Sequence, residues 1–166
     1  MVFSTLHTND ACSAITRLIN IGVEPYLIGA ALNMVLAQRL VRRICSKCRQ
    51  AYEPPRTIRR AVERMGYGMD TYYRGIGCKR CRNTGYTGRI GIHELLNIDD
   101  ELRDVIIAEP SITKIREIAV RNKMITLRHD GFRKVREGIT TVEEIMQVVG
   151  ESRDAGDPIV AVEEAT

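Results

Sequence analysis

Apolar residues recur along this chain first at strand spacing and then at helical spacing. Residues 1–6, "MVFSTL", form a short apolar run that predicts a strand. The polar "HTND" that follows supplies cap residues for a helix running to about Gly22, with apolar residues at helical spacing: Ala11, Ala14, Ile15, Leu18 and Ile19. A second helix is predicted over 25–38. It is apolar on nearly every face, so it would have to be covered on all sides.

Two strand patterns bracket the middle of the chain, "RLVRRIC" at 39–45 and "RIGIHELL" at 89–96. We predict that they are neighbours in one sheet and that the residues between them form an inserted lobe. Within this lobe, a helix is predicted to begin after Pro54 and Pro55 and to end at Gly66. Its apolar face would carry Ile58, Ala61, Val62 and Met65.

From Asp99 onward the apolar spacing is helical. One helix is predicted around Leu102, Val105 and Ile106, a second around Ile112, Ile115, Ile118 and Ala119, and a third over 127–135, closed by Gly138. Thr141 followed by Glu144 predicts a capping box for a last helix that ends at Gly150. The acidic residues 151–166 have no packing periodicity and are predicted to be disordered.

The composition is that of a folded domain, with 44% hydrophobic and 28% charged residues among 166. No apolar run approaches the roughly 18 residues that a membrane span needs, and no signal-like segment opens the chain. We therefore expect a soluble, intracellular protein.

Positive charge is concentrated in one region. Residues 39–90 hold fourteen Arg or Lys against three acids, whereas the rest of the chain holds eleven against eighteen. Such a basic island suits nucleic acid, an anionic membrane surface or an acidic protein partner, and composition does not choose among them. It also offsets the negative charge of metal-bound thiolates.

Four of the five cysteines form two Cys-x-x-Cys pairs, Cys45 with Cys48 and Cys78 with Cys81. Each pair can bring two thiolates to one ion, and two pairs complete a closed tetrahedron, so the spacing favours structural zinc. Disulfides and redox pairs are the alternatives; an intracellular chain disfavours the first, and redox pairs normally stand alone. A closed zinc site has no open position and does not activate water.

Other residues around these pairs have simpler expected roles. Gly85 and Gly88 allow the tight turn that wraps amide groups around thiolate sulfur. Cys12 is expected to be a small core residue. His93, on the second strand pattern, and His129, at a turn predicted for "HDG", are expected to be structural.

No complete active site is visible in the sequence. The chain contains no G-x-x-x-x-G-K-[ST] loop to cradle phosphates, no nucleophile elbow and no H-E-x-x-H motif. The two cysteine pairs are the one complete chemical constellation.

Three stretches carry a specific resemblance: "VFSTLHTNDACSAITRLINIGVEPYLIGAALNMVLAQRLVRRIC", "GYTGRIGIHELL" and "MITLRHDGFRKVREGITTVEEIMQVV". Together with the cysteine pairs, they make the chain up to about Gly150 resemble the C-terminal part of the ATPases that drive type II secretion and type IV pilus assembly. In that family, "STLHTNDA" and "AQRLVR" follow the Walker B motif.

The resemblance implies an α/β fold, the C-terminal part of a RecA-like P-loop ATPase core. Five parts are then expected: the end of the core at 1–44, a tetracysteine zinc lobe at 45–88, a returning core strand at 89–98, a helical subdomain at 99–150 and the acidic tail at 151–166. The whole protein would be a cytoplasmic homo-hexamer at the inner membrane, working with the membrane platform proteins of the machine. The zinc ligands would be Cys45, Cys48, Cys78 and Cys81.

The resemblance also implies a nucleotide-sensing histidine box, which maps onto Thr5, Leu6, His7, Thr8 and Asn9. The alternative for His7 is a polar residue at a strand end that caps the next helix. The Walker A and Walker B positions are missing from the chain, so ATP and Mg²⁺ belong to the intact protein. We predict that this chain alone does not hydrolyse ATP.

A competing hypothesis is a freestanding zinc module that binds nucleic acid. Basic residues around the cysteine pairs favour it, but four tyrosines of the lobe, Tyr52, Tyr67, Tyr72 and Tyr73, form no recognisable stacking platform.

Overall fold

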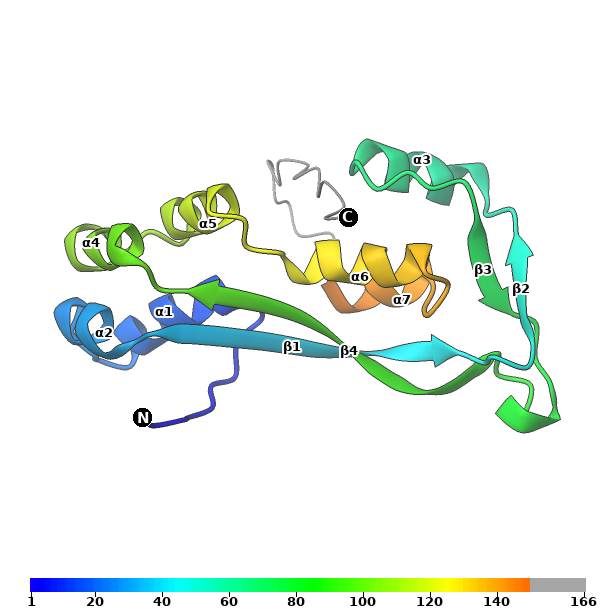
Figure 1. Ribbon diagram of the computed structural model, residues 1–166, viewed down its shortest axis with the longest axis horizontal. Helices are drawn as coiled ribbons and strands as arrows, with labels where there is room; N and C mark the ends of the chain where they lie inside the picture. Colours follow the sequence, from blue (N-terminus) through cyan, green and yellow to red (C-terminus); the bar gives the residue numbers. More distant parts are fainter. Residues whose placement is uncertain (150–166) are drawn as a thin grey trace, which may run out of the picture. The chain divides into compact units, whose positions relative to one another are not determined.

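Helices and strands alternate along the part of the chain that the computed structural model describes, residues 1–149 (Figure 1). The elements are α1 (Ala11–Asn20), α2 (Pro25–Ala31), β1 (Met34–Ile44), β2 (Arg49–Tyr52), α3 (Arg56–Arg64), β3 (Tyr72–Gly75), the 3-10 turn η1 (Lys79–Cys81), β4 (Tyr86–Asn97), α4 (Asp100–Ala108), α5 (Ile112–Arg121), α6 (Leu127–Arg136) and α7 (Val142–Val149). Gly150 and the tail predicted to be disordered lie outside the described residues.

Strands β1 and β4 pair with each other, and β2 pairs with β3. Figure 1 shows β1 and β4 running in opposite directions. The pairing of β2 with β3 is antiparallel, with Arg49 opposite Gly75 and Tyr52 opposite Tyr72. The predicted neighbours at 39–45 and 89–96 are therefore confirmed, and the residues between them are an insertion. Within residues 1–149 these are two separate two-stranded sheets.

The chain divides into two compact units. The first unit comprises Met1–Gln38 and His93–Leu127, and the second comprises Arg39–Ile92 and the chain from Arg128 onward, which is described to residue 149. The division falls within β1 and β4. The predicted domain boundaries at 45, 89 and 99 stay predictions.

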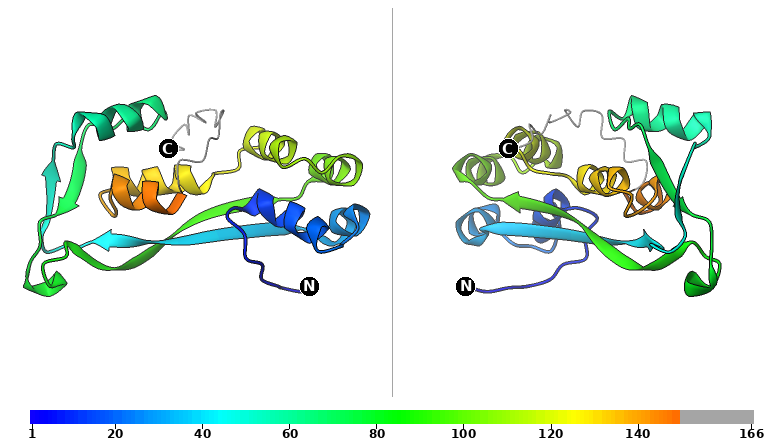
Figure 2. Two further views of the ribbon diagram at one scale, coloured as in Figure 1. Left: turned by 180° about the vertical axis from the view of Figure 1, so that it is seen from behind. Right: turned by 45° about the vertical axis from the view of Figure 1, so that its right-hand side comes forward.

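In the first unit, helices pack in two pairs, α2 against α4 and α1 against α5 (Figure 2). The close approach of α2 to α4 depends on Gly29, where an added Cβ would lie 3.0 Å from the side chain of Ile107. Buried residues contributed by all these helices fill the core: Ala11, Cys12, Ala14, Ile15, Ile28, Leu102, Ile106, Ile115, Ile118, Ala119 and Val120. Burial of apolar area by these faces is the main force that holds the unit together.

In the second unit, α6 and α7 contribute the buried residues Phe132, Val135, Val142 and Ile145. The ring of Tyr67, from the loop after α3, stacks on Phe132 with centroids 4.4 Å apart. The loop that follows the lobe helix therefore packs on α6 through this ring. An added Cβ at Gly131 would lie 2.9 Å from Ile145, so a glycine at this position lets α6 and α7 approach closely.

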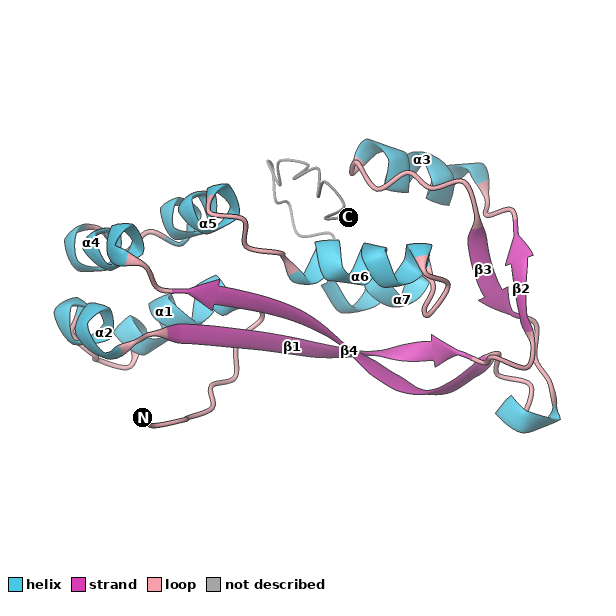
Figure 3. Cartoon of the chain, in the orientation of Figure 1, coloured by secondary structure: helices cyan, strands magenta, loops and turns pink. Residues whose placement is uncertain are grey.

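Two sequence predictions near the N-terminus are wrong. Residues 1–6 form no strand (Figure 3), and the side chains of Met1, Val2 and Phe3 are exposed. A strand needs a partner for its backbone groups, and no described strand pairs with this segment. The helix predicted over 25–38 ends at Ala31, and β1 starts at Met34, where burial begins to alternate residue by residue.

The remaining helix predictions are confirmed. Val62 is buried on α3, and the chain turns at Gly66 with φ of +81°. The predicted capping box of α7 is only half present: the Thr141 hydroxyl accepts from the Glu144 amide at 3.4 Å, but the Glu144 carboxylate binds Arg42. Within residues 1–149, no helix combines the length and the apolar character needed to cross a membrane.

Candidate metal centre

The four paired cysteines lie where the chain enters and leaves the inserted lobe. Cys45 directly follows β1 and Cys48 directly precedes β2. Cys78 caps the N-terminal end of η1, and Cys81 is its last residue. Because β1 and β4 are paired, the turn after one strand and the turn before the other come together.

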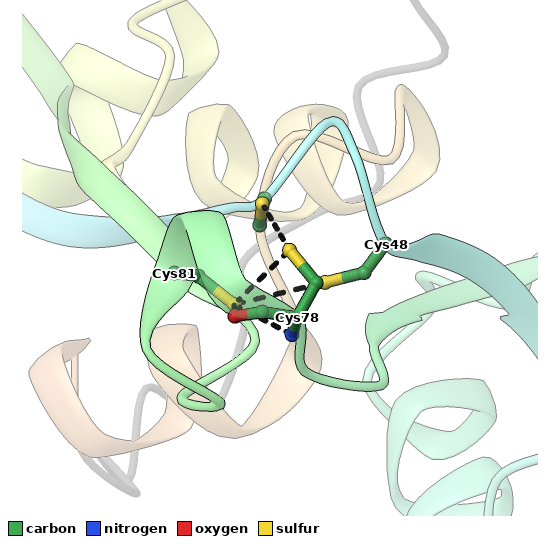
Figure 4. Close-up of side chains that lie close together, drawn as sticks. Cys48, Cys78 and Cys81 are labelled. Carbon is green, nitrogen blue, oxygen red and sulfur yellow. Dashed lines mark hydrogen bonds between the residues drawn. The ribbon is translucent and has the colours of Figure 1, made fainter.

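The four sulfurs have the spacing of a tetrahedral thiolate site. All four lie within 4.8 Å of one another. The Sγ atoms of Cys45 and Cys78 are 3.8 Å apart. The separation is 3.8 Å for Cys48 and Cys81 and 3.7 Å for Cys78 and Cys81, the three residues labelled in Figure 4. Four thiolates about 2.3 Å from one ion at tetrahedral angles lie about 3.8 Å apart. Three of the six sulfur separations therefore match a tetrahedral site, and all six lie within 4.8 Å, so the cluster could hold one metal ion.

Left-handed backbone conformations make the second turn tight enough to hold its sulfurs. Arg82 and Asn83 have φ of +51° and +61°, and Gly85 has φ of +78°. The amides of Cys78 and Gly85 both donate to the Sγ of Cys81, at 3.2 and 3.3 Å. The prediction that Gly85 wraps an amide around sulfur is confirmed, whereas Gly88, with φ of +72°, lies within β4.

The two turns are also bonded to each other. The amide of Cys45 donates to the carbonyl of Gly85 at 2.9 Å, and the amide of Ile76 donates to the carbonyl of Cys48 at 3.1 Å. Three of the four cysteines are buried and Cys78 is partly exposed. Backbone hydrogen bonds therefore hold the two cysteine turns together.

The pKa values of Cys45, Cys48 and Cys81 in this cluster are shifted in different directions. A hydrogen bond from Thr87, together with the Lys47 amide, lowers the pKa of Cys45 to about 6. Burial raises the pKa of Cys48 to about 12. Burial also acts to raise the pKa of Cys81, but the amides of Cys78 and Gly85 outweigh it and lower that pKa. A bound cation would favour thiolate at all four positions.

Basic side chains surround the cysteine turns. Lys47, Lys79, Arg80 and Arg82 are all exposed, and the first three lie between the two cysteines of a pair. Four thiolates on a divalent ion leave a net charge of about −2, which such side chains offset.

The residues predicted to sense nucleotide do not belong to the cysteine cluster. Thr5 and His7 are exposed in the segment before α1. The cap of α1 is Asp10, which accepts from the Ser13 amide at 2.7 Å, so the alternative role of His7 as a helix cap is wrong. The sensing role of His7 stays a prediction.

A second cluster, not predicted from sequence, lies in the first unit. Asp10, Cys12 and Glu94 place their ligand atoms within 4.8 Å of one another. Burial raises the pKa of Cys12 to about 12, so this thiol stays protonated. Arg116 pairs with Asp10 at 2.7 Å, and Glu94 accepts from the amides of Ala11 and Leu127 at 2.9 and 3.1 Å. These groups are already satisfied, so the cluster is structural, and Cys12 is the buried core residue that was expected.

The two remaining histidines make protein contacts. His93 Nε2 lies 3.1 Å from the Gln38 side chain on β1. The ring of His129 meets Tyr67 edge-on, with centroids 5.6 Å apart. His129 lies inside α6 and not beside a turn, because "HDG" continues the helix.

Comparison with known proteins agrees with the resemblance. The profile described as "Type II/IV secretion system protein" matches residues 1–147. The chain is 53% identical to the type IV pilus assembly ATPase PilB of Thermus thermophilus, over 88% of this chain and 17% of that protein. It is 45% identical to the type II secretion system ATPase E of Vibrio cholerae, over 92% of this chain and 30% of that protein.

A third relative, the type IV pilus assembly ATPase PilB of Myxococcus xanthus, is 40% identical over 88% of this chain and 26% of its own length. The chain therefore spans less than a third of each of these three relatives. Its matched residues include the histidine-box segment, both cysteine pairs and the helices α1 to α6. The chain belongs to the type II/IV secretion system protein family.

Proposed function

We propose that this chain is the zinc-stabilised part of an ATPase that powers type II secretion or type IV pilus assembly. Family membership supports the motor role. The observation that carries the zinc assignment is the gathering of four sulfurs within 4.8 Å, with three of their separations at 3.7 to 3.8 Å as in a tetrahedral thiolate site. The four ligands would be Cys45, Cys48, Cys78 and Cys81.

Bound zinc would act as a structural staple. It would join the turn after β1 to the turn before β4. The inserted lobe, made of β2, α3 and β3, would thus be fixed at its base. Four protein ligands leave no position for water, which excludes hydrolytic chemistry at the ion.

Metal analysis tests this assignment directly. Protein purified without chelator should contain about one zinc per chain, and Cys48→Ser or Cys81→Ser should lose the metal and loosen the lobe. Cys12→Ser is the matched control, because Cys12 lies outside the four-sulfur cluster, and it should keep its zinc. A wild-type chain that is free of metal and has a folded lobe would contradict the proposal.

The parent protein would be a cytoplasmic homo-hexamer with a RecA-like core, peripheral to the inner membrane. The exposed Lys47, Lys79, Arg80 and Arg82 give the zinc lobe a basic end that suits an acidic surface on a platform protein or a neighbouring subunit. In the intact ATPase, His7 and Thr5 would sense the bound nucleotide. Alanine at these four basic positions should weaken co-purification with the platform while zinc content stays unchanged.

The chain alone would not hydrolyse ATP. Its sequence contains no G-x-x-x-x-G-K-[ST] loop, so the phosphates and their Mg²⁺ would not be held in place. Purified chain should release no phosphate above the background given by its His7→Ala variant. Turnover that follows the chain through successive purification steps would overturn this expectation.

Nucleic-acid binding by the lobe is the competing function, and the tyrosine faces argue against it. Arg49 covers the ring of Tyr73, and Arg74 covers the ring of Tyr52, with guanidinium carbons 5.1 and 4.9 Å from the centroids. Tyr72 is buried, and Tyr67 stacks on Phe132. At least one face of Tyr52, Tyr67 and Tyr73 is therefore already occupied by a protein side chain, which disfavours these rings as a base-stacking platform. A salt titration with single-stranded DNA should show only weak binding without base preference.

A further inference from the structure

We propose that residues 138–144, here called the brace, are the outer layer that positions the cysteine pairs for metal. The brace connects α6 to the first turn of α7. It is about 90 residues from the first cysteine pair in sequence, yet it contacts the residues that flank this pair and Tyr86, shortly after the second pair. This inference rests on the proposed zinc site.

The brace contacts both sides of the first cysteine pair. The amide of Ile44, the residue before Cys45, donates to the carbonyl of Ile139 at 2.8 Å. The guanidinium of Arg49, the residue after Cys48, donates to the carbonyl of Gly138 at 3.3 Å. Gly138 has φ of +68°, and an added Cβ would lie 2.8 Å from the Tyr73 ring. The turn is therefore closely fitted against the strands that carry the cysteines.

Arg42, three residues before Cys45, is held by the brace at several points. Its backbone amide donates to Glu144 Oε2 at 2.9 Å, and its side-chain Nε donates to Glu144 Oε1 at 2.9 Å. Its carbonyl accepts from the Thr140 hydroxyl at 2.8 Å. The end of β1 is thus fixed in position and in direction.

The second cysteine pair is reached through Tyr86. The hydroxyl of Tyr86 lies 3.1 Å from the Thr141 hydroxyl, and the Arg42 guanidinium lies 4.2 Å above its ring. Tyr86 follows Gly85, whose amide donates to the Sγ of Cys81 and whose carbonyl accepts from Cys45. The brace therefore contacts the residues on both sides of the first pair directly, and the second pair only through Tyr86, which follows the sulfur-binding Gly85.

The polar side chains of the brace are buried, so they bind other protein groups and fix their positions. Thr140, Thr141 and Glu144 are only 0%, 2% and 5% exposed, and each has a hydrogen-bond partner within the same unit. Partners outside the ligand shell that orient metal ligands typically change metal affinity by about 10- to 100-fold when removed. If the brace only packed α7 in place, its loss would lower stability without a specific effect on the metal.

Zinc release separates these two roles. The 1–166 chain is loaded with one zinc, and transfer of the metal to an excess of a zinc-binding dye is followed for wild type, Glu144→Gln and Tyr86→Phe. Glu94→Gln is the matched control, because Glu94 is as buried as Glu144, at 5% exposed, but it binds the amides of Ala11 and Leu127 in the first unit. We expect release from Glu144→Gln to be faster by about 10-fold, with a smaller acceleration for Tyr86→Phe and none for Glu94→Gln.

The outcomes distinguish this inference from the zinc proposal. A wild-type chain that binds no zinc overturns the zinc site itself. A wild type that binds zinc, with equal release rates from wild type, Glu144→Gln and Tyr86→Phe, overturns the brace alone. Equal acceleration in Glu144→Gln and Glu94→Gln would show a general loss of stability and would also overturn it. If Glu144→Gln does not fold, Tyr86→Phe, which removes one hydroxyl, decides the matter.

Discussion

The amide nitrogen of Gly85 lies 3.3 Å from the Sγ of Cys81. Gly85 can take this position because it has φ of +78° and no side chain; an added Cβ would lie 2.5 Å from the carbonyl oxygen of Gly75. The same residue accepts a hydrogen bond from Cys45. A single glycine thus links the two cysteine turns and supplies a donor to one sulfur.

Gly85→Ala should therefore be far more damaging than Gly88→Ala. Both positions have left-handed φ, of +78° and +72°, but an added Cβ at Gly88 meets nothing within 4 Å. The left-handed conformation alone costs about 1–2 kcal/mol for alanine. At Gly85 the backbone clash should bring the loss to about 3 kcal/mol or more, with loss of metal. Urea unfolding and zinc content measure both effects, and similar losses at the two positions would contradict the argument.

Zinc affinity should fall as the pH falls, and more steeply below about pH 6. In the absence of metal, the pKa of Cys48 is raised to about 12 by burial, so this thiol must lose a proton to zinc at any pH below that. The pKa of Cys45 is lowered to about 6 by hydrogen bonds, so this group adds a further proton to those released only in more acidic solution. Calorimetry in buffers of different ionisation enthalpy counts the protons released. Release that does not change between pH 5 and pH 8 would contradict the prediction.

Stability in the first unit should depend on pH through Glu94. Burial raises the pKa of Glu94 in the folded state, although the amides of Ala11 and Leu127 act to lower it. The folded chain then holds a proton that the unfolded chain has already lost, so the free energy of unfolding decreases as the pH rises between the two pKa values. Glu94→Gln should remove this decrease. Its stability should also drop by about 1–3 kcal/mol, because an amide side chain leaves one buried donor unpaired.

Urea titrations of the wild type and Glu94→Gln between pH 4 and pH 8 show whether the free energy of unfolding falls or rises with pH. The advantage of the wild type should shrink as the pH rises across that window. A wild-type advantage that grows with pH would mean that the carboxylate is stabilised by the fold, against the direction given by its burial.

Asp10 should contribute to stability twice, as the cap of α1 and as the partner of Arg116. Its carboxylate accepts from the Ser13 amide at 2.7 Å and pairs with Arg116 at 2.7 Å. Asp10→Ala should cost about 1–2 kcal/mol, whereas Asp10→Asn keeps a capping oxygen and should cost less than 1 kcal/mol. Asp99→Ala, which removes the cap of α4, is the matched control. Equal losses for the alanine and asparagine variants at position 10 would show that the cap contributes nothing.

Much of the candidate site was accessible from the sequence. Two Cys-x-x-Cys pairs, a glycine after the second pair and strand patterns on both sides predicted four sulfurs gathered at the base of a lobe, and the structure brings them within 4.8 Å of one another. The lobe helix and the later helices were also predicted, because their apolar residues recur at helical spacing over two or more turns.

Other features of the fold could not be predicted from local sequence patterns. The run "PYLIGAALNMVLAQ" is apolar throughout, and an apolar run does not distinguish a helix from a buried strand by periodicity. Pairing with β4 decided that its second half is strand. Residues 1–6 have the composition of a strand, but a strand also needs a partner, and none of the described strands supplies one.

By itself, the sequence determined the grouping of the four paired cysteines, the helical faces and the family, because each depends on residue type at short, regular spacing. Only the tertiary structure decided which buried polar groups meet. Glu144 binds Arg42 across 102 positions, and Glu94 binds Ala11 across 83. Sequence spacing carries no signal for such pairs, because each depends on where distant elements pack and on the need of every buried carboxylate for a partner.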